Sequence, residues 1–159
     1  MPSESFFILL YKDMDNMIDD TQGSMPKGCR YIDLPNVTDK RGSLAFGEGG
    51  RHIPFGIKRV FWTYAIADEA ARGNHAHRTC SMVLFPLGGS FRIELDDGHD
   101  KAEILMDDPS RGALIPPLVW CKLYSFTPQA ACISLASEPY TAEDYIHDYE
   151  EFLKLTQQK

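Results

Sequence analysis

The sequence lacks an apolar run long enough to cross a bilayer. The apolar segment Phe6–Tyr11 spans only six residues, whereas a membrane-spanning helix needs about 20. No basic residue precedes this segment, and an acidic stretch follows it, so it is a poor secretory signal. We therefore expect a cytoplasmic protein that makes no contact with a membrane.

Cysteine is scarce, and its spacing excludes two kinds of site. The chain has 4 cysteines, Cys29, Cys80, Cys121 and Cys132, and no two of them form a C-x-x-C pair. This pattern does not fit a zinc knuckle or a redox-active dithiol. Without a secretory signal, the sequence predicts free thiols in a reducing compartment.

An excess of positive charge is also missing. The chain has 16 Lys and Arg against 23 Asp and Glu, which gives a net charge of −7. This balance argues against non-specific binding of nucleic acid, which needs a basic face. Residues 40–78, however, hold seven basic residues against three acids. Such a cluster favours a small anionic ligand such as a pyrophosphate, and a solvated charged surface is the alternative.

The sequence contains no internal repeat and no low-complexity segment, and 159 residues suit one domain. Residues 1–28 are predicted as an N-terminal extension, in which Phe6–Tyr11 could pair as an edge strand or lie in a partner subunit. Residues 29–159 are predicted as a single domain.

From Cys29 onward, short runs of β-branched and aromatic residues alternate with turns, which predicts an all-β sandwich or barrel. Gly88-Gly89 is predicted as a hairpin turn. Residues 141–155 show helical spacing with Thr141 as the cap, so they are predicted as one C-terminal α-helix. The predicted strands are residues 30–34, 43–46, 57–65, 75–86, 90–96, 102–106, 113–115, 119–126 and 131–137.

The most informative motif is the pair His75 and His77. Alternate side chains of a strand point to one face, so both imidazoles should project to the same side. Two imidazoles in one cavity are either metal ligands or acid–base groups, because the pKa of histidine lies near neutrality. Two surface histidines on an edge strand are the alternative reading of this motif.

Several motifs of the chain follow one another in the order and spacing that one protein family shows. They include Arg72-Gly-Asn-His-Ala-His77, the run Ile53-Pro-Phe-Gly-Ile-Lys-Arg-Val60 and Leu135-Ala-Ser-Glu-Pro-Tyr140. Over about residues 29–155 the chain resembles the WxcM-like, or sugar-nucleotide 3,4-ketoisomerase, family of cupins. The resemblance implies a cupin barrel, which is a double-stranded β-helix of jelly-roll type, with one C-terminal α-helix.

The resemblance also implies an activity. It is that of a metal-independent isomerase, without a cofactor, that moves the ketone of a dTDP-4-keto-6-deoxyhexose from C4 to C3 through an enediol. Such an enzyme would serve deoxy(amino)sugar synthesis for surface polysaccharide, including lipopolysaccharide O-antigen. The partners implied are the dTDP-linked keto sugar and a second copy of the chain, in a homodimer that exchanges N-terminal strands.

The family's proton-shuttling histidines fall on His75 and His77. The reaction needs a base, an acid and a group that holds enolate charge, and two imidazoles can supply the first two. The matched motifs make Arg41, Arg59 and Arg72 the candidates for binding the pyrophosphate. Trp62 and Trp120 are predicted to stack on the base or the sugar, with packing in the core as the alternative.

The chain departs from the cupin metal motif at two positions. The carboxylate position falls on Ser81 or Met82, and Cys121 stands where a histidine is expected. We therefore expect no metal site, and a metal-dependent cupin that uses His75, His77 and Cys121 is the alternative.

A tyrosine common in this family is replaced by Phe61, which has no hydroxyl. Together with the changes at Ser81, Met82 and Cys121, this leaves open a cupin that binds a sugar nucleotide without turnover.

Overall fold

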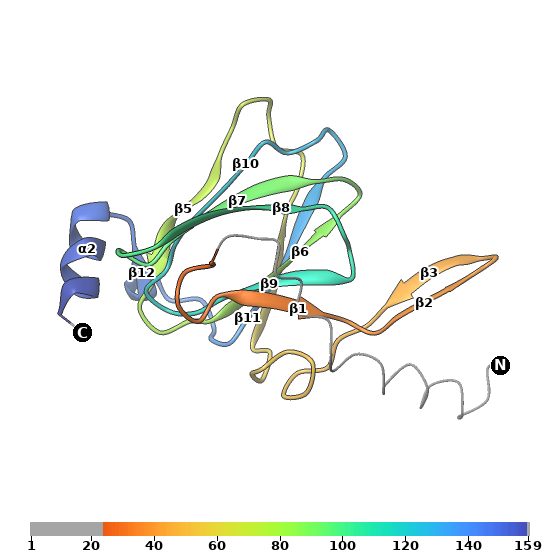
Figure 1. Ribbon diagram of the computed structural model, residues 1–159, viewed down its shortest axis with the longest axis horizontal. Coiled ribbons are helices and arrows are strands. Elements are labelled where there is room, and N and C mark those ends of the chain that lie inside the picture. Colours follow the sequence, from red (N-terminus) through yellow and green to blue (C-terminus); the bar gives the residue numbers. More distant parts are fainter. Residues whose placement is uncertain (1–23, 159) are drawn as a thin grey trace.

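Two five-stranded antiparallel sheets face each other in the computed structural model, which describes residues 24–158 (Figure 1). The first sheet has the order β1 (Arg30–Asp33), β9 (Arg111–Ile115), β6 (Met82–Leu87), β11 (Ala131–Ala136), β4 (Arg59–Thr63). The second has the order β12 (Tyr145–Ile146), β5 (Arg72–His77), β10 (Trp120–Tyr124), β7 (Phe91–Asp96), β8 (Lys101–Met106). This architecture confirms the predicted all-β cupin barrel.

Two elements lie outside the barrel. The hairpin of β2 (Asn36–Asp39) and β3 (Gly42–Ala45) projects from one end, and helix α2 (Tyr149–Gln157) lies at the other (Figure 1). Within residues 24–158, no helix combines the length and the apolar character that crossing a bilayer requires. The strand predicted for Phe6–Tyr11 falls outside the described residues.

The barrel interior is built by alternation along the strands. In β7, Phe91, Ile93 and Leu95 are completely buried, while Arg92 between them is exposed. A period of two places every second side chain on one face, so apolar residues at that spacing fill the space between the sheets. Inward residues of β6, β8, β9, β10 and β11 join those of β7 in one hydrophobic core.

Two connections differ from the sequence-based predictions. Residues 75–86 form not one strand but parts of two, because the chain leaves β5 in the second sheet and enters β6 in the first. The prediction of a hairpin at Gly88-Gly89 is also wrong, because β6 and β7 do not pair with each other. β6 pairs with β11 and β9, whereas β7 pairs with β10 and β8. Gly88 instead lies where the chain leaves β6 and passes close to the backbone of Gln129. Its φ is +71°, and a Cβ there would lie 2.7 Å from the carbonyl oxygen of Gln129, so glycine is favoured.

The C-terminal helix exists but begins later than predicted. Thr141 makes no capping bond from its side chain and is followed by a 3-10 turn (η2, Ala142–Asp144). Tyr145 and Ile146 then pair with β5 as β12. Helix α2 starts only after Asp148, whose side chain accepts a hydrogen bond from the backbone N–H of Glu151. Pairing with a neighbouring strand thus overrode the helical spacing around Tyr145.

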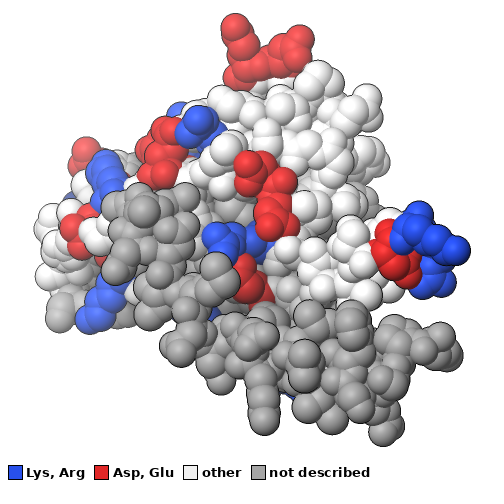
Figure 2. All heavy atoms as spheres, turned by 45° about the vertical axis from the view of Figure 1, so that its right-hand side comes forward, with Lys and Arg blue, Asp and Glu red and all other residues white. Residues whose placement is uncertain are grey.

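The face of Figure 2 carries basic and acidic side chains next to each other, separated by broad uncharged areas. At the tip of the projecting hairpin, for example, Arg41 forms an ion pair with Asp39. No uniformly basic surface of the kind that binds nucleic acid is visible on this face.

Candidate active site

Strand β5 places His75 and His77 on the interior face of the second sheet. His75 is paired across the ladder with Cys121 of β10, whose side chain is buried in the barrel core. The two imidazole rings lie with their centroids 5.0 Å apart and almost perpendicular, at 87°. The expectation that both imidazoles share one face is therefore confirmed.

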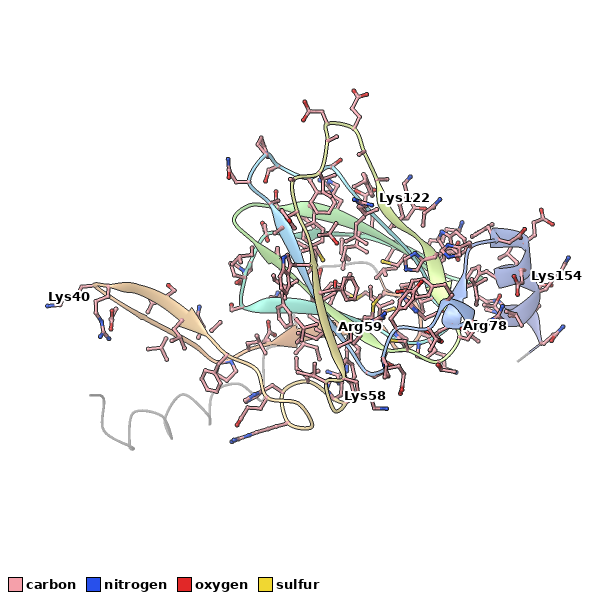
Figure 3. All side chains as sticks on the ribbon, turned by 180° about the vertical axis from the view of Figure 1, so that it is seen from behind. Lys40, Lys58, Arg59, Arg78, Lys122 and Lys154 are labelled. Carbon is pink, nitrogen blue, oxygen red and sulfur yellow. The ribbon has the colours of Figure 1, made fainter. Side chains whose placement is uncertain are left out.

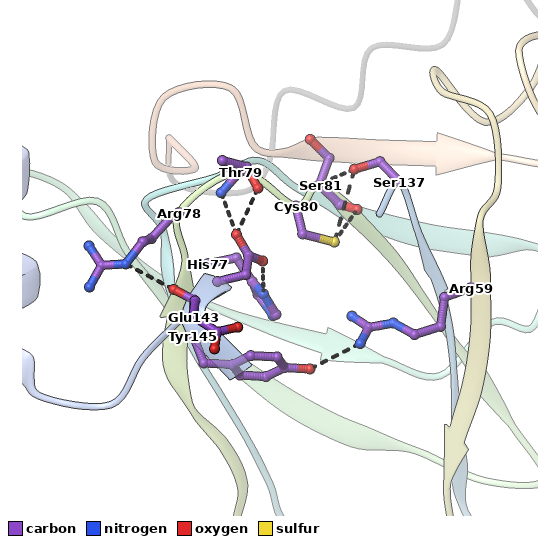
Figure 4. Close-up of polar contacts among 10 residues, drawn as sticks. Arg59, His77, Arg78, Thr79, Cys80, Ser81, Ser137, Glu143 and Tyr145 are labelled. Carbon is purple, nitrogen blue, oxygen red and sulfur yellow. Dashed lines mark hydrogen bonds and ion pairs between the residues drawn. The ribbon is translucent and has the colours of Figure 1, made fainter. Parts of the chain in front are cut away.

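His77 is held by a buried carboxylate. Its Nδ1 lies 2.8 Å from Oδ2 of Asp144, and the side chains of the two residues are only 5% and 9% exposed. Asp144 is itself fixed, because its Oδ1 accepts hydrogen bonds from the backbone N–H and the hydroxyl of Thr79 (Figure 4). This arrangement makes Nδ1 the protonated nitrogen of His77 and leaves the lone pair on Nε2.

The Nε2 atom of His77 is buried and has no hydrogen-bond partner among the described residues. A buried polar atom without a partner is costly, and such atoms are rare in folded proteins. Here the unpartnered atom is the basic nitrogen of an imidazole oriented by a carboxylate. The site is therefore arranged to accept a proton or a hydrogen bond from a ligand.

Both histidines are neutral at pH 7. Burial lowers the pKa of His75 to about 4, aided by the nearby His77 and His147, while a backbone hydrogen bond at Gly73 acts in the opposite direction. Burial also lowers the pKa of His77, although the hydrogen bond to Asp144 and the charge of that carboxylate oppose the shift. Neutral imidazoles at pH 7 can act as bases.

Two aromatic residues that the sequence analysis missed complete this cluster. Tyr145, opposite His77 in the β12–β5 ladder, has its ring centroid 4.4 Å from that of His77 and 4.9 Å from that of His75. His147 stacks on Tyr145 at 5.7 Å and lies 5.8 Å from His75. Both fell inside the predicted helix. Their two-residue spacing, which repeats that of His75 and His77, was the available signal for a strand.

Two of the three predicted arginines lie near the histidines. Arg59 of β4 reaches Tyr145, with its Nη1 3.4 Å from the phenol oxygen (Figure 4). Its Nε is buried without a hydrogen-bond partner among the described residues. Arg72 lines one cavity together with His75. Arg41 does not join them within one chain, because it lies on the projecting hairpin, whose tip is marked by Lys40 far from Arg59 in Figure 3.

Neither predicted tryptophan faces the histidine pair. Trp62 follows the inward Phe61 and so points out of the first sheet, where it is 60% exposed. Trp120 precedes the inward Cys121 and lies under helix α2, with its ring centroid 5.1 Å from Tyr149 and 5.5 Å from Phe152. Within one chain, Trp62 is therefore exposed and Trp120 packs against helix α2, while the stacking of either indole on a ligand stays a prediction.

The cavity beside His75 has a largely apolar wall. Phe61, Met82 and Cys121, which replace polar groups expected from the motifs, all line it. Burial raises the pKa of the Cys121 thiol well above its ordinary value, so this sulfur is a neutral, apolar-like surface. The complete lining is Phe61, Thr63, Arg72, Gly73, His75, Met82, Leu84, Cys121, Leu123 and Ser134.

The residues do not fit a preformed metal site. His75, His77 and Cys121 do not bring their ligand atoms together; among the described residues, the group that does is His77, Cys80 and Asp144. In that group His77 Nδ1 and Asp144 are already bonded to each other, and Cys80 Sγ is near the hydroxyl of Ser137 (Figure 4). A metal would have to break these contacts, so the atoms serve as hydrogen-bond partners.

The chain is similar to known proteins over most of its length. Residues 27–157 match the protein family described as FdtA: WxcM-like, C-terminal. The chain is 39% identical over 125 residues to the TDP-4-oxo-6-deoxy-alpha-D-glucose-3,4-oxoisomerase of Aneurinibacillus thermoaerophilus. This alignment covers 79% of this chain and 90% of the relative.

Solved structures show the same likeness. The QdtA 3,4-ketoisomerase of Thermoanaerobacterium thermosaccharolyticum, as a histidine-to-asparagine variant in complex with TDP-4-keto-6-deoxyglucose, superposes with a TM-score of 0.83 and 34% identity, over 85% of this chain and 98% of that one. The WlaRB TDP-quinovose 3,4-ketoisomerase of Campylobacter jejuni superposes with a TM-score of 0.78 and 36% identity. The match covers 81% of this chain and 99% of that one.

Proposed function

The chain belongs to the FdtA family of WxcM-like proteins, and on this premise we propose that it is an isomerase, a sugar-nucleotide 3,4-ketoisomerase acting on a dTDP-4-keto-6-deoxyhexose. The observation that carries the proposal is the unpartnered Nε2 of His77, which is buried beside His75 and oriented by Asp144. Moving a ketone from C4 to C3 requires such a base, because a proton must leave the carbon next to the carbonyl.

We propose that His77 is the base, which the contact with Asp144 and the unpartnered Nε2 support. Its Nε2 accepts the proton from C3 while the C4 oxygen takes up a proton, so an enediol forms. Asp144 stabilises the resulting imidazolium through the bond to Nδ1, and the imidazolium then returns a proton to C4. The C3 hydroxyl releases a proton when the ketone forms at C3, so the oxygen-bound protons balance. His75 is neutral, and its ring centroid lies 5.0 Å from that of His77. It is the second proton carrier and a hydrogen-bond partner for the sugar.

The two arginines near the histidines take different parts of the substrate. Arg72 lines the cavity and would bind the pyrophosphate, since guanidinium matches phosphate oxygens bidentately. Arg59 lies next to Tyr145 and so faces the sugar. No metal and no organic cofactor enters these steps.

A homodimer is part of this proposal. The outer face of the first sheet exposes Val60, Trp62 and Leu87, at 50%, 60% and 51% of their surfaces. Ile133, paired with both Trp62 and Phe85, continues the apolar strip toward the middle of the sheet. Contiguous exposed apolar area of this kind marks an interface. A second copy covering it would also bring a projecting hairpin, with Arg41, near the neighbouring chain, and the N-terminal strands would be exchanged.

The biological setting follows from the chemistry. A 3-keto sugar nucleotide is a substrate for transamination, so the product would enter deoxyamino-sugar synthesis for surface polysaccharide. The cysteines among residues 24–158 are free, in keeping with a reducing cytoplasm.

Hydrogen–deuterium exchange tests the reaction directly. The protein is incubated with dTDP-4-keto-6-deoxyglucose in D2O, and NMR follows deuterium at the carbon beside the ketone together with the 3-keto product. Wild-type protein should give both signals, and His75→Asn and His77→Asn should each reduce them. Absence of both signals with wild-type protein would refute isomerisation of this substrate.

The apolar wall formed by Phe61, Met82 and Cys121 favours one second candidate, a cupin that binds a sugar nucleotide without turnover. In that case dTDP would raise the melting temperature, because a ligand of the native state stabilises it by mass action, while no exchange would occur. If neither dTDP nor UDP changes the melting temperature, both candidates fail. Elemental analysis of the purified protein tests the metal-dependent alternative.

A further inference from the structure

We propose that Tyr145 is a catalytic acid–base residue that moves the oxygen-bound protons of the substrate, an inference that rests on the proposed ketoisomerase function. Strand β12 pairs with β5 so that Tyr145 lies opposite His77, on the same face as both histidines. Its ring centroid is 4.4 Å from that of His77 and 4.9 Å from that of His75. A sugar carbon next to His77 Nε2 would therefore have its oxygen within reach of this phenol.

The phenol is held by a cation that has one buried donor without a partner among the described residues. Arg59 Nη1 lies 3.4 Å from the Tyr145 oxygen, whereas the buried Nε of Arg59 has no hydrogen-bond partner among the described residues. The guanidinium is also fixed in place, 5.2 Å from the ring centroid of Phe61. A fixed positive charge beside the phenol stabilises the negative oxygen that remains once the phenol has given up its proton.

Other groups near the histidines are less suited to this task. Phe61 stands on the facing wall and has no hydroxyl. The Cys121 thiol is buried, and its raised pKa keeps it neutral. Tyr145 is thus the side chain that places an ionisable O–H against both imidazoles and beside a guanidinium.

The proton movements balance in two steps. In the first, His77 takes the proton from C3 while Tyr145 gives its proton to the C4 carbonyl oxygen, so a neutral enediol, an imidazolium and a tyrosinate result. In the second, the imidazolium returns a proton to C4 while the C3 hydroxyl gives its proton to the tyrosinate. The ketone is then at C3, and both residues regain their starting states. One phenol can serve both oxygens because the two are on adjacent carbons.

The test compares Tyr145→Phe with Tyr140→Phe. Tyr140 is a matched control: its ring lies 5.6 Å from that of Tyr145 and 5.7 Å from the Arg59 guanidinium carbon, but it is 65% exposed. Tyr145→Phe keeps the ring that packs on the histidines and removes only the hydroxyl. We expect kcat to fall about 100-fold or more, with the melting temperature and the affinity for dTDP unchanged, whereas Tyr140→Phe should keep the wild-type kcat.

Each outcome decides a different statement. Wild-type turnover together with an unchanged kcat in Tyr145→Phe would overturn the role of Tyr145 and leave the ketoisomerase proposal intact. A Tyr145→Phe variant that loses activity only because its melting temperature or dTDP affinity also falls would make Tyr145 a packing residue and equally overturn its role. Wild-type protein that neither isomerises nor exchanges would refute both proposals together.

Discussion

His77 donates a hydrogen bond from Nδ1 to Asp144 across 2.8 Å, although the two residues are 67 positions apart in the sequence. The contact couples β5 to the 3-10 turn that precedes β12. It fixes which nitrogen of His77 is free to act as a base, and it places a negative charge where an imidazolium would form.

Replacing Asp144 by Asn should therefore impair the base more than the fold. The amide keeps the shape of the carboxylate but removes its charge, so the pKa of His77 should fall further and its imidazolium should be less stable. We expect kcat to drop at least about tenfold, equivalent to about 1.4 kcal/mol of transition-state stabilisation. Steady-state kinetics over a range of pH measures this effect.

Glu143→Gln is the matched control for that variant, since Glu143 is the exposed acid that precedes Asp144 in the same turn. It removes the same charge without touching His77. If kcat fell equally in the two variants, Asp144 would act only through the summed negative charge of the turn and not through its contact with His77.

The stability of the fold should fall in mildly acid solution. The pKa of His75 is lowered from 6.5 to about 4 in the folded protein, so between these values the unfolded chain binds more protons. Stability is therefore complete above pH 6.5 and is lost as the pH falls toward 4. The shift corresponds to at most about 3 kcal/mol, and solvent screening of a partly exposed side chain reduces this figure.

Urea unfolding at pH 7 and at pH 4.5 measures this loss. The difference should be smaller in His75→Asn than in wild-type protein, while His99→Asn, which removes an exposed histidine, should behave like wild type. A loss that is identical in all three proteins would exclude His75 as its source.

Trp62→Glu should shift the protein from dimer to monomer. The indole is 60% exposed on edge strand β4, within the apolar face of the first sheet that we propose as the subunit interface, and burying a carboxylate there without a partner is unfavourable. The dimer dissociation constant should rise at least tenfold, or about 1.4 kcal/mol. Sedimentation velocity over a dilution series gives this constant.

Leu105→Glu supplies the comparison, because Leu105 is 42% exposed on the second sheet and lies outside the proposed interface. It should leave the association state unchanged. A monomeric wild-type protein, or dissociation caused by both variants alike, would rule out this face as the contact between subunits.

Gly98→Ala should destabilise the protein more than Gly50→Ala. Both glycines have positive φ angles, +88° and +76°, so alanine meets similar backbone strain at each, of about 1–2 kcal/mol. At Gly98 the new Cβ would also lie 2.3 Å from Thr156 Oγ1 of helix α2, whereas nothing lies within 4 Å at Gly50. We expect an additional loss of about 1–3 kcal/mol at Gly98, visible in thermal melts; equal melting temperatures would contradict it.

The sequence predicted best what depends on local periodicity. Most of the predicted strand positions are confirmed, and so is the shared face of His75 and His77, because alternation along a strand is written directly in the chain. Membership in a sheet depends on distant partners, so the break between β5 and β6 and the crossing at Gly88 could not be read locally.

The same limit applies to the site. Tyr145 and Asp144 reach His77 only because β12 pairs with β5, and the helical spacing of the residues around them concealed that pairing. For Trp62 and Trp120, alternation already contained the answer: each neighbours an inward residue, Phe61 or Cys121, and must therefore point outward. Residue type alone had suggested a stacking role for them.

Helix α2 has a consequence for how activity is lost on heating. Phe152 of this helix is completely buried against Ile146 and Trp120, and Ile146 directly follows Tyr145. The last segment of the chain thus anchors both the proposed phenol and the carboxylate that orients His77, at one edge of an otherwise complete barrel. Detachment of this edge alone would dismantle the proposed catalytic centre while the barrel stays folded, so we predict that heating abolishes activity at a lower temperature than it melts the sheets.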